Sequence, residues 1–363
     1  MNIDELNLIL KSVAANNEAM LDETGGVSIM VRIPFFTLDQ VVDGAPAEPH
    51  PAFVVNGKVV PEIWISKYQN VITEGVAQSL PGVDPAGMMT YDEALAACTA
   101  KGKGWHMMTN AEWAAIGLWC QKNGFFPEGN NWLGKAEVDR VYEAIPSSYD
   151  DQGRRAHVLT GTGPQHWSHN NEPGGIRDLN GNVVELISGV RTVRGELQII
   201  PDNDAALPLD MGVDSPVWRA VLPDGTLVDP GSQGTLKYDY CETGDRSDKQ
   251  SSAGISGNGH IVFNTTITNP DTNPRFGAMN EIVAAEGVAI PDFLKALALF
   301  PYEGGDYNGA SMFFNNTAQE KIMNRGGAQH SRMAGGVFFL SGNGDRDRRS
   351  PAIGFRAAYI AGI

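Results

Sequence analysis

The spacing of apolar residues near the N-terminus predicts an amphipathic helix within residues 2–21. Apolar side chains recur there at roughly helical intervals, namely at Leu6, Ile9, Leu10, Val13 and Met20. The turn Thr24-Gly25-Gly26 would end this helix. Residues 1–27 are therefore expected to form a helical segment that packs on the rest of the chain or makes an oligomer or particle contact.

Two more helices are predicted from the residues at their starts. Thr90 to Glu93 and Thr109 to Glu112 fit the capping box, in which a Thr hydroxyl and a Glu carboxylate bind free amides of the first turn. After the second box, four residues fall on one helical face that is expected to face the core: Trp113, Ile116, Gly117 and Cys120.

The rest of the pattern predicts short strands and turns. Runs rich in Val, Ile, Phe and Trp at 29–38 and 62–72 flank a Pro- and Ala-rich loop around 44–51. The chain from about 124 to 180 is rich in turns, contains scattered aromatic residues and shows no clear period.

Residues from about 190 to 305 are expected to form a large β-rich insertion. Turn signals such as Asp-Gly and Pro-Asp separate β-like runs at 196–200, 217–221 and 261–268. One short helix is expected near 292–299.

Composition and charge limit the classes of function that the protein can have. The 363 residues include 42 Gly, 21 Pro and 19% charged residues, which is typical of a folded protein with many turns. A net charge of -16 argues against general nucleic-acid binding, which needs clustered Lys and Arg. Residues 325–356 contain six Arg and two Asp, so this segment carries +4 and the remainder -20. The segment is either a solvated edge or a face that binds acidic or hydrogen-bonding ligands.

The cysteines and the N-terminus carry no signal of secretion. Cys98, Cys120 and Cys241 lie in no close metal or redox spacing. Cys98 and Cys120 are expected to be buried as small apolar residues on helix faces. The N-terminus lacks the basic and apolar regions of a signal peptide, and no stretch approaches the ~20 apolar residues that span a membrane. A role outside a cell would then require another route, such as assembly into a particle.

Five short motifs follow one another in a recognisable order, at residues 29–34, 64–74, 107–113, 178–186 and 354–356. Their order resembles the landmarks of the formylglycine-generating-enzyme, or sulfatase-modifying-factor, domain. The resemblance covers about residues 28–190 and 320–363. It implies an α+β fold of the C-type lectin type over residues 28–363, with the β-rich insertion within it.

The resemblance also bears on catalysis. In the copper-dependent oxidases of this family, two closely spaced cysteines follow a Gly-Gly pair and bind the metal. Counting on from Gly326 and Gly327, these positions hold Ser331 and Gly336. Neither residue supplies a soft thiolate ligand. The sequence therefore predicts a protein that is not an enzyme, and a metal-dependent oxidase of the same family is the alternative.

Residues 324–356 have a layout of their own. Residues 324–327 read Asn-Arg-Gly-Gly, an apolar strand at 337–340 lies between two polar clusters, and Gly-Phe-Arg closes the segment at 354–356. This layout resembles the variable region of proteins diversified by retroelements. In that family, adenine-directed mutagenic copying varies exposed positions while an apolar and Gly framework stays fixed. Such proteins act as phage receptor-binding tips or as cell-surface ligand binders.

The resemblance implies that the polar clusters at 328–333 and 341–352 contact the ligand. Their side chains mix donors, acceptors and adaptable groups. Arg346, Arg348 and Arg349 would anchor a ligand through planar, multi-donor contacts, or they are solvated surface charges. The residues expected to bind are Ala328, Gln329, His330, Ser331, Arg332, Met333, Ser341, Asn343, Asp345, Arg346, Asp347, Arg348, Arg349 and Ser350.

The expected function is non-enzymatic binding of a host or partner cell-surface protein or glycan. Display on a phage tail fits best, and an exposed cell surface is the other location. Virion tail proteins would then be further partners, and an oligomer would suit a fibre tip. A purely structural virion protein is the alternative.

The resemblance further implies a structural calcium site, and no other cofactor is expected. In the family, backbone carbonyls and a carboxylate bind the ion, and these are the hard oxygens that calcium prefers. Val184 and Leu186 stand where the family usually has Trp, so a buried motif without an ion is the alternative. The matching residues are Asn180, Gly181, Val183 and Glu185.

His166 and His169 have a spacing that suits a metal. No third ligand stands at a zinc-site spacing nearby, and a turn-rich loop provides no helical face to align them. Both are expected to be structural loop histidines.

Overall fold

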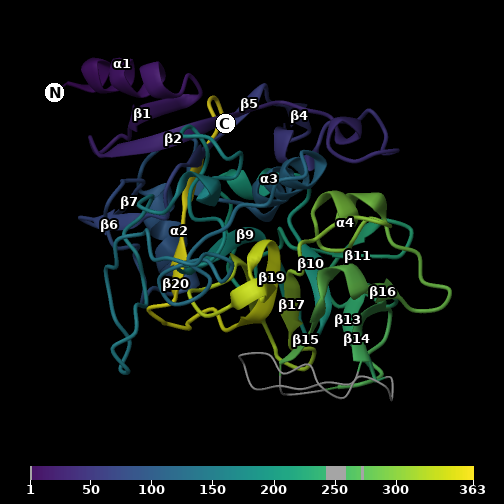
Figure 1. Cartoon of the computed structure of the whole chain (residues 1–363). Coiled ribbons are helices and arrows are strands. Elements are labelled where there is room, and N and C mark those ends of the chain that lie inside the picture. Colours follow the sequence, from purple (N-terminus) through teal and green to yellow (C-terminus); the bar gives the residue numbers. More distant parts are fainter. Residues whose placement is uncertain (1, 243–258, 271–273) are drawn as a thin grey trace.

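Most of the chain forms β-sheet, as its many short Val- and Ile-rich runs predict. The computed structural model describes residues 2–242, 259–270 and 274–363. Within these residues the fold is mixed α+β, with two large sheets and few helices (Figure 1). Part of the expected insertion, residues 243–258 and 271–273, lies outside the described residues.

The first sheet joins the two ends of the chain. Its strands lie in the order β1-β2-β5-β21-β8, and all neighbours are antiparallel. Because β21 lies between β5 and β8, the last strand of the chain completes a sheet that the first strands begin. The strands are β1 (Asn17–Leu21), β2 (Val27–Pro34), β5 (Glu62–Ser66), β8 (Trp105–Met107) and β21 (Ala357–Tyr359).

The second sheet contains the segment 324–356. Its main path is β15-β17-β19-β18-β9-β10-β13-β14-β16, and β11, β12 and β20 pair beside it. Most pairs are antiparallel, whereas β17 with β19, β14 with β16 and β20 with β9 are parallel. The strands are β9 (Val184–Val193), β10 (Glu196–Ile199), β11 (Arg219–Val221), β12 (Leu227–Val228), β13 (Lys237–Glu242), β14 (Gly259–Asn264), β15 (Arg275–Ala278), β16 (Val283–Ala284), β17 (Ser311–Phe314), β18 (Lys321–Gly326), β19 (Gly336–Gly344) and β20 (Ile353–Phe355).

The described residues also form two small hairpins, four α-helices and six short 3-10 helices. The hairpins pair β3 (Val54–Val55) with β4 (Lys58–Val59) and β6 (Val71–Thr73) with β7 (Val76–Gln78). The α-helices are α1 (Ile3–Val13), α2 (Tyr91–Thr99), α3 (Asn110–Lys122) and α4 (Asp292–Ala296). None of the helices in these described ranges is long and apolar enough to cross a membrane.

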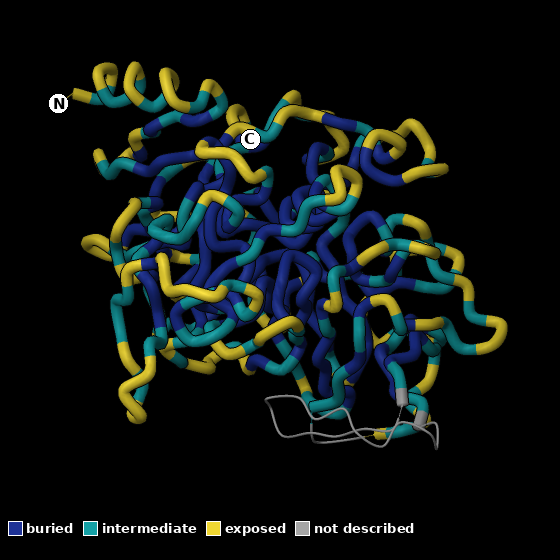
Figure 2. The backbone as a smooth tube through the Cα atoms, viewed as in Figure 1, coloured by how far each residue is buried: buried dark blue, intermediate teal, exposed yellow. Residues whose placement is uncertain are grey.

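Both predicted capping boxes form, so the starts of α2 and α3 are confirmed. The Glu112 carboxylate accepts from the Thr109 N–H at 3.0 Å, and the Thr109 hydroxyl accepts from the Glu112 N–H at 3.1 Å. Most of α3 is buried, including the predicted face (Figure 2). Cys98 and Cys120 are also buried, as expected.

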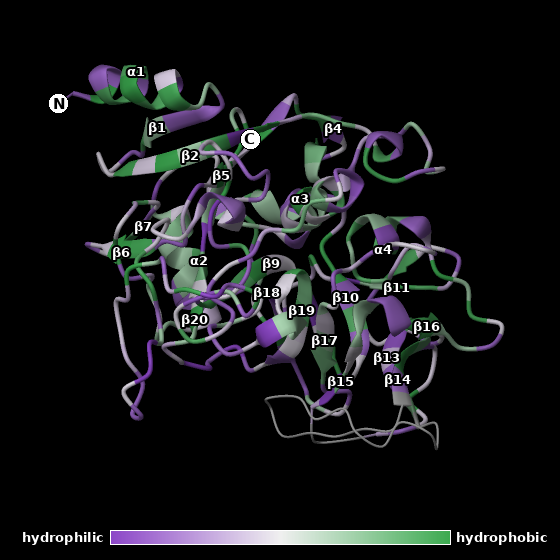
Figure 3. Ribbon diagram, in the orientation of Figure 1, coloured by the Kyte–Doolittle hydropathy of each residue, from purple (hydrophilic) through white to green (hydrophobic). Residues whose placement is uncertain are grey.

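The N-terminal helix is shorter than expected, because α1 ends at Val13. Residues 17–21 form β1, which pairs with β2, so Met20 lies in a strand. Burial alternates along β1, which is the pattern of a half-buried strand rather than a helix. The buried Asn17 side chain fixes the start of this strand, since its amide donates to the Gly174 carbonyl at 2.7 Å. In Figure 3, α1 shows apolar residues on its outer side as well.

Candidate ligand-binding surface

Two buried arginines frame the segment 324–356. Arg325 is 0% exposed, and its Nη2 donates to Asn110 Oδ1 at 2.7 Å and to the Ala298 carbonyl at 3.1 Å. Burial lowers the pKa of Arg325 to about 9. Arg356 is also 0% exposed, and Nε and Nη2 each donate to a Glu185 carboxylate oxygen at 2.6 Å. Both arginines therefore belong to the framework and not to a surface.

The apolar run at 337–340 is a buried strand, as predicted. It lies in the first half of β19, a strand that pairs with β17 and β18. The indole N–H of Trp113 donates to the Val337 carbonyl at 2.7 Å, which ties β19 to α3. Phe338 packs edge-on against Tyr307, with ring centroids 4.7 Å apart. This strand holds the two polar clusters in fixed positions.

The first polar cluster, residues 328–333, forms the connection between β18 and β19. Ala328 is only 5% exposed, so its side chain does not face a ligand as expected. It is buried because its N–H donates to the Ser331 hydroxyl at 2.9 Å and closes a tight turn. His330 and Met333 are exposed, Met333 by 44%. Gln329 is half-buried, and its N–H donates to the Asn182 carbonyl at 3.1 Å.

Arg332 is the most firmly positioned exposed residue of this cluster. Its backbone has a φ of 53°, in the left-handed region that non-glycine residues rarely adopt. Its guanidinium carbon lies 3.8 Å from the centroid of the Trp132 ring, and Nη1 lies 3.7 Å from Glu137 Oε1. The side chain is still 54% exposed. Arg332 therefore presents a planar donor group whose position is already fixed.

Residues 131–137 support this cluster, and the sequence analysis did not identify them. The Arg332 N–H donates to the Asn131 carbonyl at 2.8 Å, and the Met333 N–H donates to Glu137 Oε2 at 3.0 Å. The only sequence signal was the aromatic and turn-rich character of residues 124–180. Large apolar side chains that follow Glu137 are more than half exposed: Val138, Val141, Tyr142, Ile145 and Tyr149. Exposed apolar groups of this density often mark an interaction site.

The second polar cluster, residues 341–352, begins at the end of β19 and crosses to β20. Ser341, Asn343 and Ser350 are half-buried, whereas Asp345 is exposed. The Asp345 carboxylate accepts from Lys321 Nζ at 2.6 Å. Asp347 and Arg348 are exposed, and their side chains have no hydrogen-bond partner in the described part of the chain.

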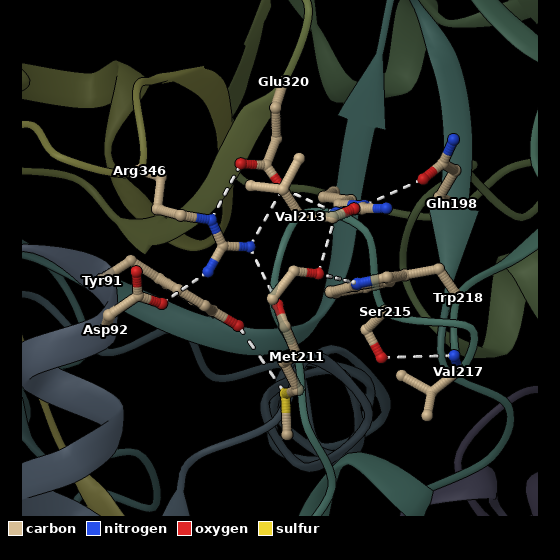
Figure 4. Close-up of polar contacts among 12 residues, drawn as sticks. Tyr91, Asp92, Gln198, Met211, Val213, Ser215, Val217, Trp218, Glu320 and Arg346 are labelled. Atoms are coloured by element: carbon tan, nitrogen blue, oxygen red, sulfur yellow. Dashed lines mark hydrogen bonds and ion pairs between the residues drawn. The ribbon is translucent and has the colours of Figure 1, made fainter.

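The Arg346 side chain binds other residues of the protein and does not point freely to solvent (Figure 4). Its Nε and Nη2 donate to the Glu320 carboxylate at 2.9 and 3.0 Å, and Nη1 donates to Asp92 at 2.6 Å. Its side chain is 13% exposed and lies over the Tyr91 ring. Burial raises the pKa of Glu320, but the hydrogen bonds and charges of Arg346 and Arg191 outweigh it and leave that pKa below its usual value. Arg346 thus anchors the crossing.

Arg349 makes a second anchor at the start of α2. Its two terminal nitrogens donate to the two carboxylate oxygens of Glu93 at 2.7 and 2.6 Å, and Nη1 also donates to the Met88 carbonyl at 2.9 Å. The hydrogen bond from Arg349 lowers the pKa of Glu93 to about 2. Of the three arginines expected to anchor a ligand, Arg348 is therefore the one whose charge is unpaired among the described residues.

The two polar clusters start at opposite ends of β19, but the last residues of the second cluster lie close to the first cluster. In the β18–β19 hairpin Gly326 pairs with Gly336 and Ile322 with Gly344, so the ends of β19 lie ~26 Å apart at ~3.3 Å per residue. The end of the second cluster comes back toward the first. Its Ala352 carbonyl accepts from the Val184 N–H, and Val184 lies two residues after Asn182, whose carbonyl accepts from Gln329 of the first cluster. The clusters form an arc and not one compact patch.

The residues of the expected calcium site surround an amide nitrogen. Nε2 of Gln69 lies 3.0–3.3 Å from four oxygens: the carbonyls of Asp178, Gly181 and Val183, and Glu185 Oε1. Calcium needs its oxygen ligands at 2.3–2.6 Å around an open centre, and here the side chain of Gln69 fills that centre.

Other groups of that site also have protein partners. Arg356 binds both carboxylate oxygens of Glu185 and neutralises its charge. The Asn180 amide nitrogen donates to the Pro127 carbonyl at 3.0 Å, whereas its buried Oδ1 has no hydrogen-bond partner among the described residues and is not among the oxygens around Gln69. The residues present do not fit a calcium ion in this arrangement.

The two positions that hold cysteines in the oxidases have structural roles here. The Ser331 hydroxyl accepts from the Ala328 N–H within the turn, and Gly336 begins β19 with a φ of 119°. The buried Cys98 and Cys120 have raised pKa values because burial disfavours their thiolates. Neither is placed with a second thiol near the segment 324–356.

No family model and no curated protein matches this sequence. Two solved structures align with 94% of the chain. PvdO from Pseudomonas aeruginosa has 12% identity and a TM-score of 0.33, with 97% of its chain covered. Treponema denticola variable protein 1 has 12% identity and a TM-score of 0.34, with 98% covered. Similarity at this level supports no inference about function.

Proposed function

We propose that this protein is a non-enzymatic display protein that binds ligands through a diversified surface on a scaffold of the C-type lectin type. The observation that carries the proposal is the burial pattern of residues 324–356. The positions expected to stay fixed, including Arg325, Val337 and Arg356, are buried and hydrogen-bonded. Positions expected to vary, such as His330 and Arg348, are exposed.

The exposed groups suit recognition of a protein or a glycan. Arg332 is held flat on Trp132, so little side-chain entropy is lost when it binds. The exposed Met333 supplies adaptable apolar contact area. Arginine and aromatic residues dominate the energetically important positions of interfaces. The ligand is then a molecule on a host or partner cell surface, and the protein sits at a phage tail tip, where an oligomer would present several copies of the arc.

Catalysis is not proposed, for a chemical reason. The oxidase chemistry of the resembled family requires a pair of soft thiolate ligands, and Ser331 and Gly336 occupy those positions. A metal-dependent oxidase would need other ligands, and a purely structural virion protein would need no varied surface. Measured turnover with bound copper or iron would overturn this part of the proposal.

Sequencing the gene across its natural population tests the proposal directly. We expect substitutions to accumulate within codons 325–356, at adenine-derived positions, with the codons for Arg325 and Arg356 constant. Structure sharpens this expectation, because variation should concentrate at His330, Arg332 and Arg348 and spare Ala328. Even variation along the chain would contradict the proposal and favour a fixed partner or a structural role.

A further inference from the structure

A small pocket opens between β2, α3 and the loop at 169–170. It has a volume of about 220 Å³, and none of its lining residues belongs to the segment 324–356. This volume is several times the ~30 Å³ of one water molecule, so it can hold a ring with one polar substituent. The pocket is separate from the proposed recognition surface, and the inference below does not depend on the proposed function.

His169 places a buried, unpaired donor at this pocket. The residue is 5% exposed, and its Nδ1 accepts from the Ile176 N–H at 2.8 Å. The proton of the neutral ring is therefore on Nε2. Within the described residues, Nε2 has no hydrogen-bond partner. Burial, with a smaller effect of the Arg356 charge, lowers the pKa of His169 to about 3, so the ring stays neutral and Nε2 stays a donor.

Arg32 adds a cation at the mouth of the same pocket. Its side chain is 49% exposed. Among the residues that the structure describes, its charged group has one polar contact, a long one of 3.5 Å between Nη1 and Glu62 Oε2. Most of the guanidinium donors are therefore available to a ligand, because a contact of this length is at the limit of a hydrogen bond.

The two amides that line the pocket also offer donors. Asn16 Oδ1 accepts from the Asn17 side chain at 3.3 Å, and Asn170 Oδ1 accepts from the Glu172 N–H at 3.1 Å. Their Nδ2 groups have no partner in the described ranges of the chain. Every polar side chain that lines the pocket thus has a donor without a partner in the described part of the chain, and no carboxylate is among the lining residues.

The walls between these groups are apolar. Trp119 is the partly exposed aromatic residue of the largely buried α3, and its ring centroid lies 5.3 Å from that of His169. The other apolar lining residues are Ile33, Pro34, Phe36, Ala115 and Ile116. Since the indole of Trp119 faces the pocket beside the donors, a flat apolar group can lie against it while an acceptor reaches His169 and Arg32.

We propose that this pocket binds a small carboxylate with an aromatic or apolar body. The carboxylate is acceptor-only and carries the charge opposite to Arg32, so it matches the unpaired donors. A cation would meet the positive charge of Arg32 and find no carboxylate among the lining residues. The apolar body would replace water against Trp119, Phe36 and Ile116.

Isothermal titration calorimetry of the whole chain with sodium benzoate and with benzamide tests the proposal. The two probes have the same shape and differ in charge. We expect benzoate to bind once per chain and benzamide at least about tenfold more weakly, because a charge-assisted hydrogen bond is lost. Arg32→Gln should weaken benzoate binding by about tenfold and leave benzamide binding nearly unchanged.

A matched variant and a site-specific signal complete the test. Arg219→Gln removes another partly exposed arginine, paired with Asp229 outside the pocket, and should leave benzoate binding unchanged. The Nε2 resonance of His169 should shift on addition of benzoate. Three results would each overturn the proposal: no benzoate binding detected at concentrations well above about 1 mM, equal affinity for benzoate and benzamide, or benzoate binding that Arg32→Gln leaves unchanged.

Discussion

Replacing Gln69 with alanine should create a calcium site, so that calcium stabilises the variant and leaves the stability of the wild type unchanged. In the wild type, the Gln69 amide donates into a ring of three backbone carbonyls and the Glu185 carboxylate. This amide therefore holds the four oxygens together, as the ion does in a calcium site. Its removal would leave hard oxygen ligands around an empty centre, which is the arrangement that calcium prefers.

The size of the destabilisation follows from the groups that lose partners. Gln69 is fully buried, and the Gly181 and Val183 carbonyls would lose their side-chain donor. Asn182 Nδ2 would lose the Gln69 Oε1 acceptor but keep the Val158 carbonyl at 3.1 Å. Each buried group left unpaired costs about 1–3 kcal/mol, so the variant should lose about 3–5 kcal/mol in total.

Thermal unfolding measured with calcium and with EDTA distinguishes the outcomes. The unfolding entropy of 363 residues is about 0.75 kcal/mol/K, so Gln69→Ala should lower the Tm by about 4–7 °C in EDTA. Calcium at a hundredfold excess over its Kd would restore about 2.7 kcal/mol. The wild-type Tm should be the same in both buffers.

Gln198→Ala is the matched control for this experiment. Gln198 is also a buried glutamine, and it bonds to Arg191 and Glu196 in the second sheet. This variant should lose stability without responding to calcium. A wild-type Tm that rises with calcium would refute the reasoning, and so would a Gln69→Ala variant that loses no stability.

Three further predictions concern the anchors and the thiols. Arg346→Ala should lower the free energy of unfolding by about 2 kcal/mol, because the largely buried Glu320 then keeps only Arg191 as a partner. Arg348→Ala should change it by less than about 0.5 kcal/mol; urea unfolding measures both, and equal effects would contradict the assignment of Arg346 as an anchor. Because the pKa of Glu320 is lowered in the folded protein, its ionised form contributes stability at pH values above the ordinary pKa of 4.5, and this contribution is lost as the pH falls through the lower folded pKa. The Tm measured against pH should therefore fall less steeply in acid for Glu320→Gln than for the wild type. A thiol reagent should modify Cys241 in the native protein and all three cysteines in urea, because the other two are buried with raised pKa values; rapid native modification of all three would contradict the burial.

Local signals predicted the helices where their partners lie nearby in sequence. The capping boxes at Thr90 and Thr109 act over three residues, and both formed as expected. The N-terminal helix ended early because β1 is fixed by contacts far along the chain, such as that of Asn17 with Gly174, 157 residues away. The break between β5 and β6 has the same origin, since the buried Lys67 side chain donates to the Pro173 carbonyl. No local pattern carries such information.

The candidate surface shows the same limit. The sequence indicated which residues of 341–352 are polar, but not which of them already have partners. Arg349 pairs with Glu93, 256 residues earlier, and Arg346 pairs with Glu320, 26 residues earlier. Three of the four expected calcium ligands, Gly181, Val183 and Glu185, lie around a common centre, and the Gln69 that fills it lies 116 residues from Glu185. Pairing over such separations follows from the fold and not from composition.

The buried anchors explain how this surface could vary without loss of the fold. Domains are stable by only about 5–15 kcal/mol, so a region that accepts many substitutions must place them where each costs little. Exchanges at His330, Arg332 or Arg348 leave the buried pairs of Arg325 and Arg356 intact. A lost buried ion pair, by contrast, costs about 3–5 kcal/mol. The tolerance of the arc to change therefore depends on arginines that a ligand never touches.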